Sequence, residues 1–259
     1  MRWAACIEYD GTQYHGWQSQ PHASSVQDSL EAALSSVANE PIRTVCSGRT
    51  DSGVHAQGQI VHFDTRADRR ERSWLLGTNR YLADDIAPQW FVRVPETFHA
   101  RFNAIARDYR YWILDRDAPS ALWRSRAWHV HRRLDAQAMH TAAQTLVGEH
   151  DFSAFRAAGC QAKSPVRRLH HLNVTRSGDW LRIDVRANAF LHHMVRNIVG
   201  TLAVIGRGEA APSWIGELLI GGDRRYAGMT APAGGLSLRR VYYPDEIDWP
   251  RPALDDAGW

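Results

Sequence analysis

The chain has 259 residues, of which 44% are hydrophobic and 23% are charged, and its formal net charge is +3. This length and composition predict one large or two small globular domains and exclude a protein of low complexity. The three cysteines form no CxxC pair, no apolar run could cross a bilayer, and the N-terminus lacks a signal-peptide pattern, so we expect a cytoplasmic protein with no disulfide framework, zinc finger or membrane segment.

The first half of the chain predicts the element order β-α-β-β-α-β. Ser24 or Ser25 is expected to cap the first helix, because apolar residues recur at helical spacing from Val26 onward. The expected strands are 2–9, 42–47, 59–64 and 89–94, and a short second helix is expected over 71–79.

The second half predicts the same order. Strands are expected over 109–115, 167–175, 181–187 and 237–242. Helices are expected after Asp135, over 189–205 and from Pro212. The sequence therefore predicts an α+β fold of two ferredoxin-like β-α-β-β-α-β halves around a central, mostly antiparallel sheet, with an active-site cleft between the halves. The expected domains are 1–104, which carries the aspartate loop discussed below, and 105–259.

Charge is unevenly distributed along the chain. Eight arginines stand against three aspartates between Arg101 and Arg133, whereas the tail from Pro244 is acidic. A basic middle suggests a polyanionic partner. Lys163 is the only lysine, so the chain prefers arginine throughout. The number of arginines is therefore weak evidence for such a partner, and their positions must decide.

The loop GRTDSGVHAQGQIVHF, residues 48–63, is unusually elaborate for a chain reversal. A carboxylate at Asp51, close to the guanidinium of Arg49, suits a nucleophile or a base better than an acid. The three glycines of the loop are expected to let the backbone fold tightly around Asp51. The alternative is a simple Asx-turn with a solvated arginine. The loop alone does not decide between them.

The segment FHARFNAIARDYRYWI, residues 98–113, interleaves aromatic residues and arginines. Bases stack on aromatic rings while arginines hold phosphates, so this composition fits a site for a single-stranded or flipped nucleotide. An ordinary core strand with a charged edge explains it equally well.

Other motifs are uninformative or absent. On the predicted helix 189–205, His192 and Arg196 lie four residues apart on a polar flank, which is also common on solvated helices. There is no GxGxxG after a strand, no GxxxxGK[ST] and no HExxH, so a dinucleotide cofactor, nucleotide hydrolysis and a metal are not expected.

With these pieces assembled, the chain resembles the family of tRNA pseudouridine synthase A. The resemblance rests on six motifs in the family's order: YDGTQYHGWQSQ, GRTDSGVHAQGQIVHF, FHARF with RDYRY, HDFSAFR, NAFLHHMVRNIVGTL and APAGGLSL. Ala83 departs from the family, which usually has proline there. This change affects the stiffness of a loop rather than the reaction.

The resemblance implies isomerisation of uridine to pseudouridine at positions 38, 39 and 40 in the anticodon stem-loop of tRNA, without a cofactor or metal. It implies that Asp51 is the catalytic residue, that Tyr109 stacks on the target base, that Arg49 assists its extrusion, and that Arg196 lies in the active-site cleft. Whether Asp51 attacks C1′, attacks C6 or acts as a base stays open. Further expected tRNA contacts are Phe98, His99, Ala100, Arg101, Phe102 and Arg69.

The resemblance also implies a homodimer in which each tRNA contacts both subunits. The competing class is a non-catalytic RNA-binding protein on the same fold, which would need no aspartate at position 51. A metal-dependent hydrolase is a more distant alternative.

Overall fold

The computed structural model describes residues 1–244, 249 and 250. The acidic residues of the tail, from Asp245 on, therefore lie outside the described residues. The chain forms two compact units, one of Met1–Ile105 with the chain from Leu238 on, and one of Ala106–Ser237. The fold is α+β with mostly antiparallel strand pairing, as predicted. The division into domains 1–104 and 105–259 stays a prediction, although the strand expected over 237–242 in the second half falls with the first unit from Leu238 on.

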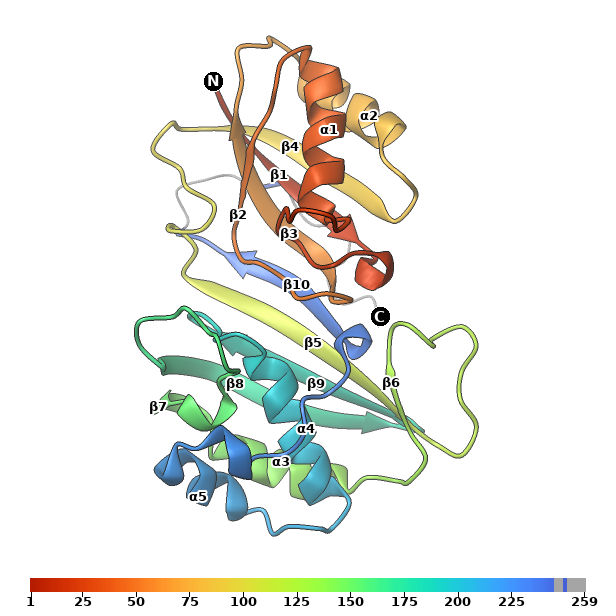
Figure 1. Ribbon diagram of the computed structural model, residues 1–259, viewed down its shortest axis with the longest axis vertical. Helices are drawn as coiled ribbons and strands as arrows, with labels where there is room; N and C mark the ends of the chain where they lie inside the picture. The colour runs from red at the N-terminus through yellow and green to blue at the C-terminus, as the bar shows by residue number, and fades with distance from the viewer. Residues whose placement is uncertain (245–248, 251–259) are drawn as a thin grey trace. The chain divides into compact units, whose positions relative to one another are not determined.

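The first unit contains a four-stranded path, β4-β1-β3-β10, and β2 also pairs with β3. The helices α1 and α2 lie next to each other (Figure 1), and α2 packs on β4. The elements are β1 (Arg2–Tyr9), η1 (Gly11–Gln13), α1 (Val26–Ala38), β2 (Thr44–Cys46), β3 (His55–Asp64), α2 (Glu71–Tyr81), β4 (Ile86–Val94) and β10 (Leu236–Tyr242). Up to β4, this is the predicted β-α-β-β-α-β order.

Trp74 of α2 is the centre of the core between helix and sheet. Its side chain is fully buried, and its ring centroid lies 6.1, 5.2 and 6.2 Å from the rings of Trp3, Phe63 and Phe91, one from each of three strands. Large aromatic rings bury more apolar surface than any other side chains, so truncating Trp74 to alanine would cost about 3–5 kcal/mol.

The helix and strand ends follow the local chemistry. The hydroxyl of Ser25 accepts a hydrogen bond from the amide of Asp28, so Ser25 caps α1, and Asn39 ends it in the left-handed conformation. Strand β4 begins at Ile86, earlier than predicted, and runs through Pro88. Proline is tolerated there because β4 is the outer strand of its path.

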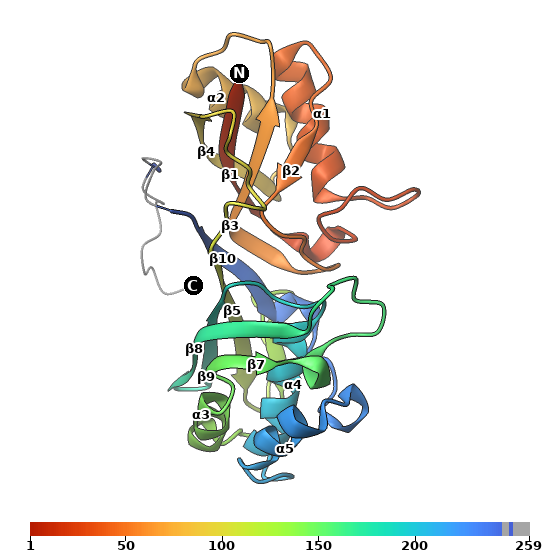
Figure 2. The same ribbon diagram turned by 90° about the vertical axis from the view of Figure 1, so that its left-hand side faces the viewer.

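The second unit has the strand path β5-β9-β8-β7, and the short β6 pairs with β5 in parallel. The helix α3 packs on β8 and on α4, and the helices gather together in both views (Figures 1 and 2). The elements are β5 (Ala106–Asp115), β6 (Trp128–Val130), α3 (Ala136–Gln144), β7 (Gly148–Asp151), η2 (Ser153–Phe155), β8 (Val166–Ser177), β9 (Trp180–Ala187), α4 (Met194–Gly206), α5 (Trp214–Gly221), η3 (Arg224–Tyr226) and η4 (Ala233–Gly235).

Two predictions for the helices of this unit were wrong at the helix starts. Helix α4 begins at Met194 rather than at residue 189, because His193 takes a left-handed conformation with φ of 60°. His192 therefore precedes the helix and does not share a helical flank with Arg196. Helix α5 begins at Trp214, two residues after Pro212.

Over the described residues, no helix combines the length and the apolar composition needed to span a bilayer.

Candidate active site

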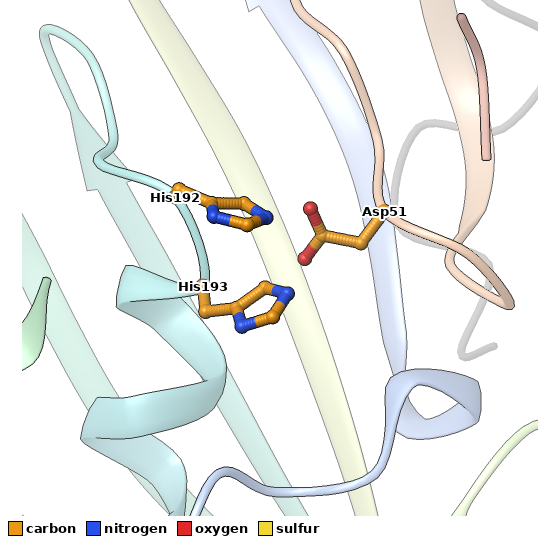
Figure 3. Close-up of side chains that lie close together, drawn as sticks. All are labelled: Asp51, His192 and His193. Atoms are coloured by element: carbon orange, nitrogen blue, oxygen red, sulfur yellow. The ribbon is translucent and has the colours of Figure 1, made fainter. Parts of the chain in front are cut away.

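The loop that carries Asp51 is fixed through its main chain by the segment that follows β1. The amide of Trp17 donates to the carbonyl of Thr50 at 3.1 Å, and the amide of Gly53 donates to the carbonyl of Tyr14 at 3.3 Å. These two bonds hold the loop on both sides of Asp51. The Asp51 side chain is half-buried, and Figure 3 shows it extending from this loop.

Two glycines allow this close approach. A Cβ on Gly16, whose φ is +92°, would lie 2.7 Å from the carbonyl oxygen of Thr50 and 3.1 Å from the main chain of Asp51. A Cβ on Gly11 would lie 2.0 Å from the carbonyl oxygen of Val54. The sequence did not suggest a structural role for the motif YDGTQYHGWQSQ. In the structure, Gly11 and Gly16 of this motif form the bed of the Asp51 loop, that is, the surface against which the loop packs.

The three glycines of the loop itself are not equivalent. Gly53 has a φ of +76°, and a Cβ on Gly58 would lie 2.4 Å from the carbonyl oxygen of Arg239 in β10. Gly48 has no positive φ, and a Cβ added there would have no neighbouring atom within 4 Å. The expectation of tight folding is met at positions 53 and 58 but not at 48.

Gln59 holds the entrance of the loop. Its side chain is fully buried, donates to the carbonyl of Gly48 at 2.7 Å, and accepts from the hydroxyl of Ser47 at 2.6 Å. A buried amide whose oxygen and nitrogen are both hydrogen-bonded stabilises the fold, because an unpaired polar atom in the interior is costly. Gln59 thus ties the loop to β3.

His55 has a structural role. Its Nδ1 accepts a hydrogen bond from the amide of Gly11 at 3.0 Å, and the carboxylate of Asp10 lies 3.1 Å from the same nitrogen. Because Nδ1 cannot accept and donate at once, we assign the acceptor role, which satisfies a buried amide. Its ring is buried beneath the loop.

Arg49 is exposed on the loop. Withdrawal of the Cys46 thiol from water raises its pKa to about 11, and the positive charges of Arg49 and Arg101 oppose that rise. Both guanidinium groups therefore act on the same thiol, although the two arginines are far apart in sequence.

The segment around Arg101 is a hydrogen-bonded turn whose tip is exposed. The imidazole of His99 accepts hydrogen bonds from the amides of Arg101 and Phe102, both at 3.2 Å, and stacks on the Phe102 ring with centroids 4.2 Å apart. Phe102 is 75% exposed, whereas Phe98 and Ala100 are buried.

The buried end of this turn rests on His62 of β3. Its Nδ1 accepts from the amide of Ala100 at 3.1 Å, and its ring centroid lies 6.1 Å from that of Phe98. Burial lowers the pKa of His62 to about 4, and the charge of Arg2 acts in the same direction. His62 is therefore neutral at physiological pH.

In the second unit, Tyr109 of β5 is half-buried, and its ring meets that of Phe190 edge-on with centroids 5.1 Å apart. Figure 3 shows the imidazoles of His192 and His193 close together, with ring centroids 4.0 Å apart. His193 holds a left-handed conformation that is uncommon outside glycine, and such strain is concentrated at functional sites.

Arg196 in the first turn of α4 is anchored to a neighbouring segment. Its Nε donates to the carbonyl of Ala231 at 2.8 Å, and its own carbonyl accepts from the amide of Ala231 at 3.1 Å. Burial raises the pKa of Tyr111, whose hydroxyl donates to the carbonyl of Pro232, and the charge of Arg196 opposes that rise.

Asn197, which sequence reasoning missed, fixes the same segment. It is fully buried, donates to the carbonyl of Phe155 at 2.8 Å, and accepts from Arg224 at 3.1 Å and from Thr230 at 2.7 Å. A Cβ on Gly200 would lie only 1.7 Å from the carbonyl oxygen of Met229. In the sequence, both are only a polar residue and a glycine within an apolar helix, and neither reveals its distant partner.

The structure groups the predicted site residues by unit. Asp51 and Arg49 share one loop of the first unit. The turn around Arg101 belongs to the same unit. Tyr109 and Arg196 belong to the second unit. That these two sets share one cleft stays a prediction.

An α+β chain that presents one aspartate on a fixed loop, with arginines and exposed aromatic rings, fits the class of RNA-modifying enzymes. A family model described as tRNA pseudouridine synthase matches residues 5–103 and 142–244. The chain therefore belongs to the tRNA pseudouridine synthase family, and it is an isomerase.

Curated relatives match nearly the whole chain. A protein named tRNA pseudouridine synthase A from Aliivibrio salmonicida is 54% identical over 254 residues, covering 98% of this chain and 97% of the relative. One of the same name from Hydrogenovibrio crunogenus is 53% identical over 253 residues, with the same coverage. The crystal structure of a Cbf5-Nop10-Gar1 complex is a distant match, with a TM-score of 0.37 and 11% identity over 93% of this chain and 59% of that chain, and it carries no argument.

Proposed function

We propose that this enzyme isomerises uridine to pseudouridine at positions 38, 39 and 40 in the anticodon stem-loop of tRNA. The observation that carries the proposal is the Asp51 loop, whose main chain is bonded on both sides of the aspartate by the segment at Tyr14 and Trp17. A reacting carboxylate must be held in a defined geometry, and this loop supplies that geometry.

The reaction needs no redox step. The bond between ribose C1′ and base N1 breaks, the uracil turns within the site, and C5 bonds to C1′. The proton on C5 leaves to solvent, and N1 gains a proton. Because the product is an isomer of the substrate, neither an electron acceptor nor ATP is required, and we propose that the enzyme works without cofactor or metal.

The roles we assign follow the family resemblance. Asp51 is the catalytic residue, and its attack on C1′, attack on C6 and action as a base remain three separate possibilities. The target uridine must leave its stack, which costs a few kcal/mol. Stacking on Tyr109, at about 1–3 kcal/mol, and occupation of the vacated space by Arg49 offset much of that cost. Arg196 belongs to the same site.

The proposed tRNA contacts of the turn at residues 98–102 fall into an exposed group and a buried group. Arg101 and Phe102 are exposed, and the Arg101 guanidinium lies 5.7 Å from the Phe102 ring centroid. This pair offers a charge for phosphate and a ring for a base. Phe98 and Ala100 are buried, so we propose that they hold the turn while Arg101, Phe102 and the half-buried His99 meet the RNA.

We further propose that the enzyme is a cytoplasmic homodimer in which a tRNA contacts both subunits. The homodimer and its shared tRNA rest on the family resemblance, and the cytoplasmic location rests on the cysteine pattern. Light scattering coupled to size exclusion measures the mass directly, and a monomer at micromolar concentration would refute the dimer.

The deciding experiment uses tRNA that carries tritium at uridine C5. The wild-type protein should release tritium and remain active in EDTA. Asp51→Ala should bind the tRNA and release none, whereas Asp84→Ala, at an exposed position of the same unit, should release it at the wild-type rate.

Each alternative has its own outcome. Binding without tritium release by the wild-type protein would identify a non-catalytic RNA-binding protein. Loss of activity in EDTA would favour a metal-dependent enzyme. Appreciable turnover by Asp51→Ala would refute the assignment of Asp51.

A further inference from the structure

The connection between β3 and α2 is strongly basic. Residues 66–72 read RADRRER and contain four arginines against Asp68 and Glu71. Of these residues, only Arg69 is among the tRNA contacts expected from the sequence. In the structure, this segment leaves the end of β3 and enters the first turn of α2.

An open hollow of about 370 Å³ lies at this place. Its lining is Trp3, Arg69, Arg70, Glu71, Arg72 and Arg93. Four of these six residues are arginines, from the connection, the helix and strand β4. An open, charged depression suits a segment of an extended polyanion better than an enclosed small molecule.

Several of these guanidinium groups are not used by the fold. Across the described part of the chain, the side chains of Arg70 and Arg72 form no hydrogen bond or ion pair, and the Nε of Arg69 makes one long bond, 3.4 Å, to the carbonyl of Val37. Arg93 pairs with Asp68 at 2.9 Å and lies over the ring of Trp3. Like charges gathered without partners disfavour the fold slightly, so a ligand of opposite charge is the simplest reason for them.

Two further groups at the hollow lack partners. Helix α2 has Arg70 at its N-cap with no side-chain capping bond, so its first amides carry the partial positive charge of a helix start. Trp3 is 1% exposed, and its indole Nε1 has no acceptor among the described residues. The indole nitrogen of Trp74, in the same core, lacks an acceptor as well, so the charge of the arginines and of the helix start carries the argument.

The hollow lies away from the Asp51 loop on the same unit. Asp51 precedes the first residue of β3, and the arginines follow its last residue; the strand between them is shown in Figure 2. Ten residues of strand span about 30 Å. A ligand that fills the hollow is therefore not the nucleotide at Asp51.

We propose that this hollow binds the phosphate backbone of the tRNA at a distance from the uridine that reacts. The proposal rests on the proposed function, because it takes tRNA as the substrate. Guanidinium groups bind phosphate oxygens in a bidentate manner, and several such contacts add affinity without reading sequence.

The test is the binding of a full-length tRNA transcript and of its isolated anticodon hairpin, each measured by fluorescence anisotropy over a series of salt concentrations. For Arg70→Glu/Arg72→Glu, affinity for the full-length tRNA should fall about 10- to 100-fold at low salt. The slope of log affinity against log salt should fall by about 2, since each lost phosphate contact removes about 1. The affinity for the hairpin should be unchanged.

Folding does not confound this variant, because glutamate in the first turn of a helix is favourable. The matched control is Arg80→Glu, an exposed arginine in the last turn of the same helix, and it should keep the wild-type slope. Circular dichroism and urea unfolding should confirm that both variants are folded.

Three outcomes would overturn the proposal: an unchanged salt slope in the double variant, an equal change in Arg80→Glu, or an equal loss of hairpin binding. The first would leave an acidic protein partner as the occupant to test. None of these outcomes bears on tritium release by the wild-type protein, so failure of this proposal is distinguishable from failure of the proposed function.

Discussion

The two ends of strand β3 are built in opposite ways. At its start, the Asp51 loop is bonded through its main chain, rests on Gly11 and Gly16, and has a half-buried carboxylate. At its end, exposed arginines surround an open hollow and make few bonds to the rest of the unit. Chemistry at a carbon atom needs a fixed geometry, whereas attraction of a phosphate chain needs only charge within reach. The two ends should therefore fail in different ways when they are mutated.

Gly16→Ala should have the largest effect, because it is expected to lower both stability and kcat. The new Cβ would be 2.7 Å from the carbonyl oxygen of Thr50, and the residue would keep a φ of +92° that alanine disfavours. We expect a loss of about 1–3 kcal/mol in the free energy of unfolding and a fall in kcat of about 100-fold, because Asp51 is displaced. Single-turnover kinetics and urea unfolding measure the two effects. An active variant with the wild-type kcat would contradict the claim that this loop is held for precision.

Asn197→Leu tests whether the start of α4 in the second unit is held as firmly as the Asp51 loop. The substitution leaves the carbonyl of Phe155 and the side chains of Arg224 and Thr230 without their buried partner. We expect a loss of about 2–3 kcal/mol in stability, measured by urea unfolding. The matched control is Asn173→Leu at an exposed position of β8, where a change above about 0.5 kcal/mol is not expected.

His62→Asn tests the support of the turn at residues 98–102. The pKa of His62 is lowered from 6.5 to about 4 in the folded protein. A lowered pKa means that the folded state resists protonation of His62. The contribution of the neutral imidazole to the free energy of unfolding is therefore complete above pH 6.5 and is lost as the pH falls toward 4. Relative to pH 8, the wild-type protein should lose about 2 kcal/mol at pH 5 from this group alone.

Asparagine can keep the bond from the amide of Ala100 without titrating, so the variant should lack that part of the loss. Urea unfolding at both pH values measures the difference. Parallel pH profiles for the two proteins would show that His62 does not titrate as the structure indicates.

Gly48→Ala should have the smallest effect on stability, within about 0.5 kcal/mol. This position has no positive φ and no neighbour within 4 Å of the added carbon. A large destabilisation would mean that the loop is constrained at its entrance as well as at Asp51. Thermal unfolding of this variant beside Gly16→Ala gives the comparison within one structural element.

Sequence reasoning found most of the fold because its signals are local. Ser25 and Asp135 cap helices as predicted, and the alternation of apolar residues located the main strands. It placed the start of α4 five residues too early, since the left-handed conformation of His193 leaves no trace in a periodicity of 3.6 residues. The short strands β6 and β7 were missed because three or four residues carry too little pattern.

The sequence singles out only part of the candidate site, and the catalytic role of Asp51 stays a prediction. Asp51 was found because its loop has an unusual composition and belongs to a recognisable motif. The bed formed by Gly11 and Gly16 and the network around Asn197 were not found, because a contact across forty or thirty residues has no local signature. The importance of Gly16 depends on where Thr50 lies, and only the folded chain provides that information.

Strand β3 also constrains how this protein can change over evolution. It pairs with β1 in a register that sets Trp3 opposite Phe63 and, after a shift between Ile7 and Tyr9, sets Tyr9 opposite Ala56. Deleting one residue would turn every later side chain to the opposite face of the sheet. The length of the strand therefore fixes the distance between the aspartate and the arginines. Its side chains can be exchanged, but an RNA that binds at both ends must match that distance.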